Sequence, residues 1–168
     1  MGSAVTATKL EQQAARMILS LNDFEEALSY LYAKPAANAT VVRRALLTSA
    51  IVAYARPFSE NERGQRSQAT AMVALRPKKL LTPEQLSLHN CLLDIRNRAI
   101  AHSTSEVRPV IHKVIRPAGS MSGHFVFDVM TQSIDRPLFA SLCDVLHGAC
   151  RKGLAEINDR IRGVQSAT

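Results

Sequence analysis

The sequence predicts an all-α protein, a four-helix up-down bundle with a β-hairpin inserted before the last helix. Three observations lead to this fold class. Apolar residues between positions 10 and 31 recur at alternating four- and three-residue steps, the spacing of bundle helices. A clear helix start signal lies in the middle of the chain, at Thr82. Between residues 107 and 131 the period changes to two, which is typical of strands.

The first helix is expected over residues 8–33. Thr8 followed by Glu11 has the form of a capping box, and Pro35 stops the helix. The apolar residues of this segment form one stripe along the helix, which a bundle helix needs to keep one seam buried. The stripe consists of Leu10, Ala14, Met17, Leu21, Phe24, Leu28 and Leu31.

The second helix is expected to start at Asn38 or Thr40 and to run to about residue 56, with Pro57 as its stop. Its predicted buried face carries Val42, Leu46, Ser49 and Ala53. The segment 59–79 that follows is polar and rich in Arg and Gln. A short helix is expected within it, over residues 68–75, closed by Pro77.

The third helix has the best start signal. Thr82 suits the N-cap and Pro83 suits the first helical position. Glu84 and Gln85 fill the first turn. We expect this helix to carry its apolar residues to Ile95 and to end close to His102, where a run of Ser and Thr begins. Its apolar residues are Leu86, Leu88, Leu92, Leu93 and Ile95.

The inserted hairpin is expected at about residues 107–131, before the last helix. Its first half is rich in β-branched residues, and in its second half Phe125, Phe127 and Val129 alternate with other side chains. The last helix should span residues 137–162, with Cys143 and Cys150 buried in its core face. Its apolar stripe is Leu138, Leu142, Val145, Ala149, Leu154, Ile157 and Ile161.

Composition excludes several classes of protein. The chain has 168 residues, of which 46% are hydrophobic and 21% charged, so intrinsic disorder is excluded and a single domain over residues 1–168 is expected, with an ordered core at about 8–162. No apolar run approaches the roughly 18 residues of a membrane span, and no signal peptide is visible. Three cysteines without a CxxC pair exclude a disulfide framework and a four-cysteine zinc site, which predicts reduced thiols in a cytoplasm.

The charge balance indicates a polyanionic partner. Lys and Arg number 21 against 14 Asp and Glu, a net charge of +7, and this surplus favours nucleic acid. The alternative interpretation is that the excess of positive charge only keeps the protein soluble and marks no binding partner. Aromatic residues make up 5% of the chain and Trp is absent, so a base-stacking platform is not expected.

The candidate chemistry lies at the expected end of the third helix. Arg96, Asn97, Arg98 and His102 fall within seven residues. Arg offers a planar, permanently charged donor fork for phosphate, and His exchanges a proton near neutral pH. Together they suffice for phosphodiester cleavage without a metal. The alternative is structural, since Arg and His also stabilise helix C-termini.

On one continuous helix, Arg96 and His102 would point about 120° apart. They converge only if the helix ends before His102 or if a second copy of the chain completes the site. A composite site of this kind predicts a homodimer with the third helix near its two-fold axis.

The stretch RNRAIAH at residues 96–102 resembles the signature of HEPN domains: an Arg, a polar neighbour, and a His four to six residues after the Arg. The Tyr-Ala-Arg-Pro-Phe element at residues 54–58 and the Leu-His pair at 88–89 also look like features of bacterial HEPN-like proteins. The resemblance covers most of residues 8–162 in architecture and about seven residues in specific motif. It implies a HEPN-type bundle, to which the hairpin would be an addition.

The resemblance further implies a metal-independent endoribonuclease of a toxin, antiphage or other defence-type system, with its site at a homodimer interface. Carried over, Arg96 binds phosphate and stabilises the transition state, Asn97 is the polar partner, and His102 is the acid or base. The implied partners are RNA, a second copy and, for a toxin, an antitoxin protein, with no cofactor and no membrane. One departure concerns control: where some toxins carry a modifiable Tyr two residues after the His, this chain has Thr104.

Three further residues are candidates for RNA binding. Arg98 lies within the motif. His89, seven residues before Arg96, would line the same cleft or be a hydrogen-bonded histidine within the bundle. Arg56, at a helix end, would reach phosphate or hold the loop. His112 and His124 lack Cys or carboxylates at metal spacing, so no metal site is expected.

Two other function classes stay open. One is a non-catalytic HEPN-like module that binds RNA, nucleotide or a protein partner, and the other is a structural dimerisation protein without a ligand.

Overall fold

The computed structural model describes residues 2–36, 39–59, 75–97, 110–115, 121–126 and 134–166. This part of the chain is mostly helical, and its helices form a bundle, as predicted. The helices are α1 (Gly2–Tyr32), α2 (Thr40–Ala55), the 3-10 helix η1 (Arg56–Phe58), α4 (Pro77–Leu80), α5 (Pro83–Ile95) and α7 (Arg136–Gln165).

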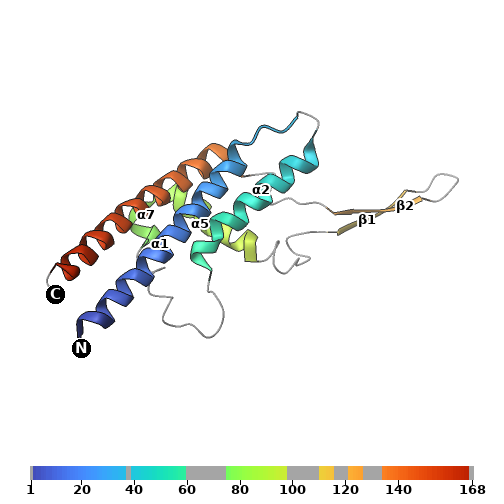
Figure 1. The fold of residues 1–168 in the computed structure, drawn as a ribbon. Helices are drawn as coiled ribbons and strands as arrows, with labels where there is room; N and C mark the ends of the chain where they lie inside the picture. Colours follow the sequence, from blue (N-terminus) through green and yellow to red (C-terminus); the bar gives the residue numbers. More distant parts are fainter. Residues whose placement is uncertain are drawn as a thin grey trace.

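Helix α1 is the centre of the arrangement. It packs against α7 on one side and α2 on the other, and α5 contacts both α2 and α7. The start of α1 and the end of α7 lie at the same end of the bundle, so these two long helices run antiparallel, side by side (Figure 1). The short η1 continues from α2 and contacts α1, and α4 contacts α7.

Two short strands precede α7. Strand β1 (Val110–Ile115) pairs antiparallel with β2 (Met121–Val126), with Val110 opposite Val126 and Ile115 opposite Met121. The rest of the segment 107–131 lies outside the described residues, including the expected strand positions Phe127 and Val129.

The predicted stripe of α1 is confirmed, because five of its residues are buried and Leu21 and Leu28 pack against the core. The predicted capping box at Thr8 is wrong: helix α1 begins at Gly2, so residue 8 lies inside it. Residues 3–8 contain neither Gly nor Pro, and nothing in them stops the helix from extending toward the N-terminus.

The predicted face of α2 is wrong in part. Of its four positions only Ala53 is buried, while Val42 is 48% exposed. The buried residues of this helix are Leu47, Ala50, Ile51, Ala53, Tyr54 and Ala55. The buried residues all lie between Leu47 and Ala55, so burial extends around the C-terminal part of the helix and is absent from its first turns. Helix α2 contacts α1, α5 and η1, and these partners decide which of its residues are buried.

Helix α7 runs from Arg136 to Gln165, close to the predicted bounds, and Asp135 caps it by accepting a hydrogen bond from the Leu138 backbone N–H at 2.9 Å. Cys143 and Cys150 are fully buried, as predicted. The predicted stripe is confirmed only in part: Leu142 and Ile157 are buried, while Ala149, Leu154 and Ile161 are partly buried against the core. The buried face is rotated from the stripe because α7 packs against both α1 and α5. It also includes Phe139, Ala140 and Leu146.

Candidate functional site

Helix α5 leads to the candidate site, and its start is set locally. The Thr82 hydroxyl accepts a hydrogen bond from the Gln85 backbone N–H at 3.2 Å, and the Gln85 side chain accepts one from the Thr82 backbone N–H at 3.1 Å. This is a complete capping box with Pro83 at the first helical position. The predicted start is therefore confirmed. The Gln85 amide also donates to the Ser141 hydroxyl at 3.2 Å, which ties α5 to α7.

The middle of α5 is anchored in an aromatic cluster made of Phe24, Tyr54, Phe58, His89 and Phe139. The ring of Tyr54 lies within 6 Å, centroid to centroid, of the other four. His89 is 6% exposed, and its Nδ1 lies 2.6 Å from the Tyr54 hydroxyl oxygen, a buried hydrogen bond between α5 and α2. Because a lone buried polar group is costly, this pair fixes the rotation of α5 against the core.

Burial sets the protonation of this pair. Desolvation lowers the pKa of His89 and raises the pKa of Tyr54, so both side chains are neutral near pH 7. A neutral imidazole presents one donor and one acceptor, which suits a single hydroxyl partner. Of the two readings given for His89, the buried hydrogen bond to Tyr54 fits the hydrogen-bonded histidine within the bundle.

Helix α5 ends at Ile95, and Arg96 and Asn97 follow with π-helical geometry. The Arg96 guanidinium donates from Nη1 to the Asn97 Oδ1 at 3.0 Å. Arg96 is half-buried and Asn97 is exposed. A cation at this position is favoured by the negative end of the helix dipole, and the remaining guanidinium donors are sufficient for bidentate contact with a phosphate.

Arg98 and His102, the other two members of the motif, lie outside the described residues, as does the predicted helix end near His102. The structure therefore brings Arg96 and Asn97 together and gives no distance to the histidine.

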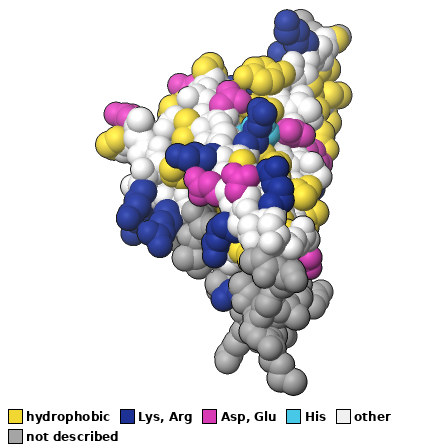
Figure 2. Space-filling view, turned by 60° about the vertical axis from the view of Figure 1, so that its left-hand side comes forward, with side chains coloured by type: hydrophobic (Ala, Val, Ile, Leu, Met, Phe, Trp, Pro, Cys, Tyr) yellow, Lys and Arg dark blue, Asp and Glu magenta, His cyan; other side chains and the backbone are white. Residues whose placement is uncertain are grey.

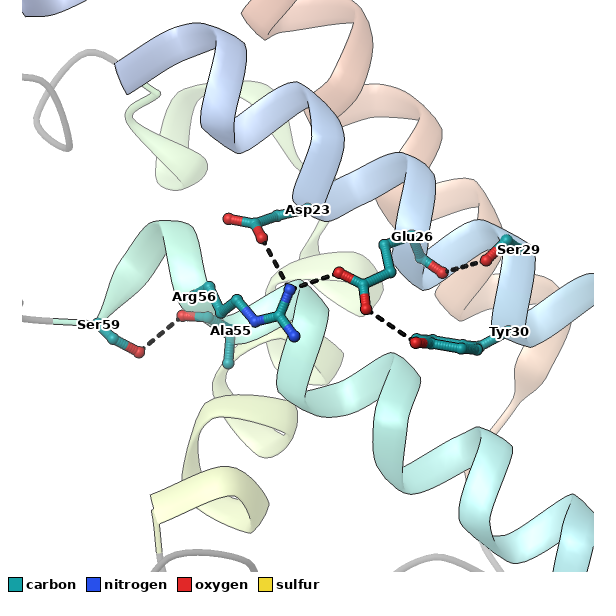
Figure 3. Close-up of polar contacts among 7 residues, drawn as sticks. All are labelled: Asp23, Glu26, Ser29, Tyr30, Ala55, Arg56 and Ser59. Carbon is teal, nitrogen blue, oxygen red and sulfur yellow. Dashed lines mark hydrogen bonds and ion pairs between the residues drawn. The ribbon is translucent and has the colours of Figure 1, made fainter. Parts of the chain in front are cut away.

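Arg56 is held by two carboxylates of α1. Its Nη1 lies 3.1 Å from Asp23 Oδ1 and also pairs with Glu26 Oε2 (Figure 3). The Tyr30 hydroxyl donates to the other oxygen of Glu26 at 2.8 Å. Burial raises the pKa of Asp23 although Arg56 opposes it, and the hydrogen bond from Arg56 lowers the pKa of Glu26. This geometry fits the reading in which Arg56 holds the loop, because phosphate binding would have to compete with two anions.

The structure brings together a group of basic residues that the sequence did not predict as a site. A groove of about 450 Å³ lies between α1, α4 and α7. Arg76, Lys79, Lys152 and Arg160 line it, together with one acid, Glu156. The first two cations precede α5 and the last two lie on α7, so no local motif joins them. Figure 2 shows a face of the molecule on which Lys and Arg side chains lie among Asp and Glu.

Among the described residues, no group of three or more His, Cys, Asp or Glu side chains could hold a metal ion. In the same residues, no helix is long and apolar enough to cross a membrane.

In comparisons with known proteins, no family model matches the chain, and no significant match is found among the curated proteins or the solved structures.

Proposed function

We propose that this chain is a metal-independent endoribonuclease of HEPN type that acts as a homodimer in a toxin, antiphage or other defence-type system. The observation that supports the proposal most is the contact between the Arg96 guanidinium and the Asn97 amide at the end of a core-anchored helix. His102 follows six positions after Arg96 in the sequence. RNA is the substrate that fits the net charge of +7.

In the proposed reaction the RNA supplies its own nucleophile. His102 removes the proton from a ribose 2′-hydroxyl, and the oxygen attacks the adjacent phosphorus. The bond between phosphorus and the 5′-oxygen breaks, and the protonated His102 of the second protomer donates a proton to the leaving oxygen. The products are a 2′,3′-cyclic phosphate and a 5′-hydroxyl end. Arg96 stabilises the charge that develops on the phosphoryl oxygens, and Asn97 orients the guanidinium. The histidine of the second protomer, facing the first motif, would complete each site.

The test is RNA cleavage in excess chelator by the wild type, His102→Ala and the control His147→Ala. His147 lies on α7, where its Nε2 lies 3.0 Å from Glu25 Oε1, remote in sequence from the motif. The expected loss is about 10²–10⁴-fold for His102→Ala, the usual range for a general acid or base, and little for His147→Ala. A substrate with a 2′-deoxyribose at the cleaved position should be inert.

Equal activity of His102→Ala and the wild type would refute the assignment. Activity that disappears with chelator and returns with magnesium would refute the mechanism. Both variants must keep the wild-type melting temperature, because a loss caused by unfolding would point to a structural histidine.

The alternative function is a non-catalytic module that binds RNA, nucleotide or a protein partner such as an antitoxin. One observation favours it: the Arg96 guanidinium, oriented by the Asn97 amide, suffices to bind a phosphate without any proton-transfer group. Charge reversal at Arg96 or Arg98 should weaken RNA binding more than reversal at Arg160 or Arg162 if the motif is the RNA site. Salt-sensitive binding without cleavage, with the larger effects at Arg96 and Arg98, would support the module. Equal effects at all four positions would mean that the attraction is diffuse and that no RNA site exists.

A further inference from the structure

The groove between α1, α4 and α7 combines an apolar floor with a cationic rim. Met17, Leu75 and Ile157 form its buried part, with 4–8% of each side chain exposed. The charged residues that line it are exposed. A volume of about 450 Å³ is within the range of small-molecule sites. The groove therefore offers one ligand an apolar surface and a positively charged edge.

The cations of the rim are not used by the fold. Arg76, Lys79, Lys152 and Arg160 form no ion pair within the part of the chain that the structure describes. By contrast Arg56 and Arg162 are paired with carboxylates. Within the described residues, four cations and one carboxylate line this groove, and this excess of positive charge favours an anion.

The floor of the groove contains a close contact between Met17 of α1 and the backbone of α7 at Gly153. Gly153 lies inside α7, where Gly is unfavourable by roughly 0.5–1 kcal/mol relative to Ala. An added Cβ would lie 3.2 Å from the Met17 Cε, so the glycine allows this methyl group to lie against the α7 backbone. Methionine is flexible and polarizable, which suits a surface that adapts to an apolar guest.

We infer that this groove binds a free amphiphilic anion, a carboxylate or phosphate carried on an apolar chain or ring. The apolar body lies on Met17, Leu75 and Ile157, and the anionic head contacts the rim. RNA is a poor occupant, because the groove is lined by aliphatic and methionine side chains and by no aromatic ring on which a base would stack. The inference uses no residue of the segment 96–102 and does not depend on the proposed ribonuclease activity.

The first test is calorimetric titration with dodecanoate below its micelle concentration. One molecule should bind per chain, and dodecyltrimethylammonium, with the same chain and the opposite charge, should bind at least about tenfold more weakly. Lys152→Glu should weaken dodecanoate binding about 5- to 10-fold, as expected for a partly exposed ion pair turned repulsive. The matched control is Arg151→Glu, which makes the same charge change at the adjacent residue, outside the groove, and should cost less than about twofold.

A second variant is expected to tighten dodecanoate binding instead of weakening it. Glu156→Gln removes the one carboxylate of the rim and should tighten dodecanoate binding about two- to threefold. In a ¹³C-methyl spectrum, the Met17 resonance, assigned by its loss in Met17→Leu, should shift along the same binding curve.

Four results would overturn the inference: no binding of dodecanoate, equal binding of the cationic amphiphile, equal effects of Lys152→Glu and Arg151→Glu, or an unmoved Met17 methyl group. Binding to vesicles of anionic phospholipid without binding of free dodecanoate would also overturn it, since the occupant would then be a lipid surface.

Discussion

The buried hydrogen bond between Tyr54 and His89 offers the sharpest test of the packing. Tyr54→Phe removes the hydroxyl and keeps the ring, so the contacts with Phe24, Phe58 and Phe139 stay. The change leaves the His89 Nδ1 in a site that is only 6% exposed, without the partner it has at 2.6 Å. An unsatisfied buried acceptor or donor costs about 1–3 kcal/mol.

Urea unfolding followed by circular dichroism measures this loss, and the melting temperature should fall by roughly 2–10 °C for a chain of this size. The matched control is Tyr30→Phe. The Tyr30 hydroxyl also donates a short hydrogen bond, 2.8 Å to Glu26, but this bond is only partly buried and the Glu26 side chain is 36% exposed, so water can take the place of the hydroxyl. This control should lose much less stability.

Equal losses in the two variants would refute the reasoning, because the argument depends on burial and not on the bond itself. A loss below about 0.5 kcal/mol in Tyr54→Phe would refute it as well, since surface substitutions fall in that range.

Three further outcomes are expected. Burial lowers the pKa of His89 below its value of about 6.5 in the unfolded chain, so the unfolded state binds the proton more readily. The stability that His89 contributes should therefore be present well above pH 6.5 and be lost as the pH falls below about 6.5 in urea titrations, with a smaller slope in His89→Gln. Gly148→Ala, whose Cβ meets no atom within 4 Å, should add about 0.5–1 kcal/mol to the unfolding free energy, and Gly153→Ala less, because its Cβ lies 3.2 Å from a methionine methyl. Arg56→Gln should raise the pKa of Glu26 in a carboxyl NMR titration, because the Arg56 hydrogen bond is the largest cause of its lowering; an unchanged pKa would contradict this.

Helix starts and stripes were predictable where the signal is local. Thr82, Pro83 and Gln85 lie within four positions and complete their capping interactions among themselves. The stripe of α1 was predictable because its polar and apolar positions alternate clearly. The capping-box prediction failed at Thr8, because such a pattern marks the start of a helix only where the residues before it disfavour helical geometry.

The rotation of α2 was not predictable from its own residues. Apolar side chains occur all round this helix, from Val41 and Val42 to Ile51 and Val52. Its partners decide which of them are buried, and the buried residues lie at the C-terminal half. A helix without a polar face carries no periodic signal of its orientation.

Long-range pairing limited the prediction of the site in the same way. The motif at residues 96–102 is contiguous and was found, whereas the role of Arg56 depends on carboxylates 33 and 30 positions away. The groove cations come from two segments separated by α5 and the strands. Lysine and arginine pairs at residues 78–79 and 151–152 were visible, but only the fold brings one member of each to the same groove.

The core and the candidate site share one helix face. Arg96 follows His89 by seven residues, which rotates it by only about 20° around the axis of α5. His89, Leu92 and Ile95 are buried, and the hydrogen bond to Tyr54 prevents this face from turning. Arg96 therefore leaves the helix in a direction set by the aromatic cluster, and its bond to Asn97 restricts the guanidinium further. The packing of α5 and the bond to Asn97 both restrict the Arg96 side chain before a ligand arrives. Such a cation loses little conformational entropy on binding a phosphate, and a fixed orientation is what charge stabilisation in a transition state requires.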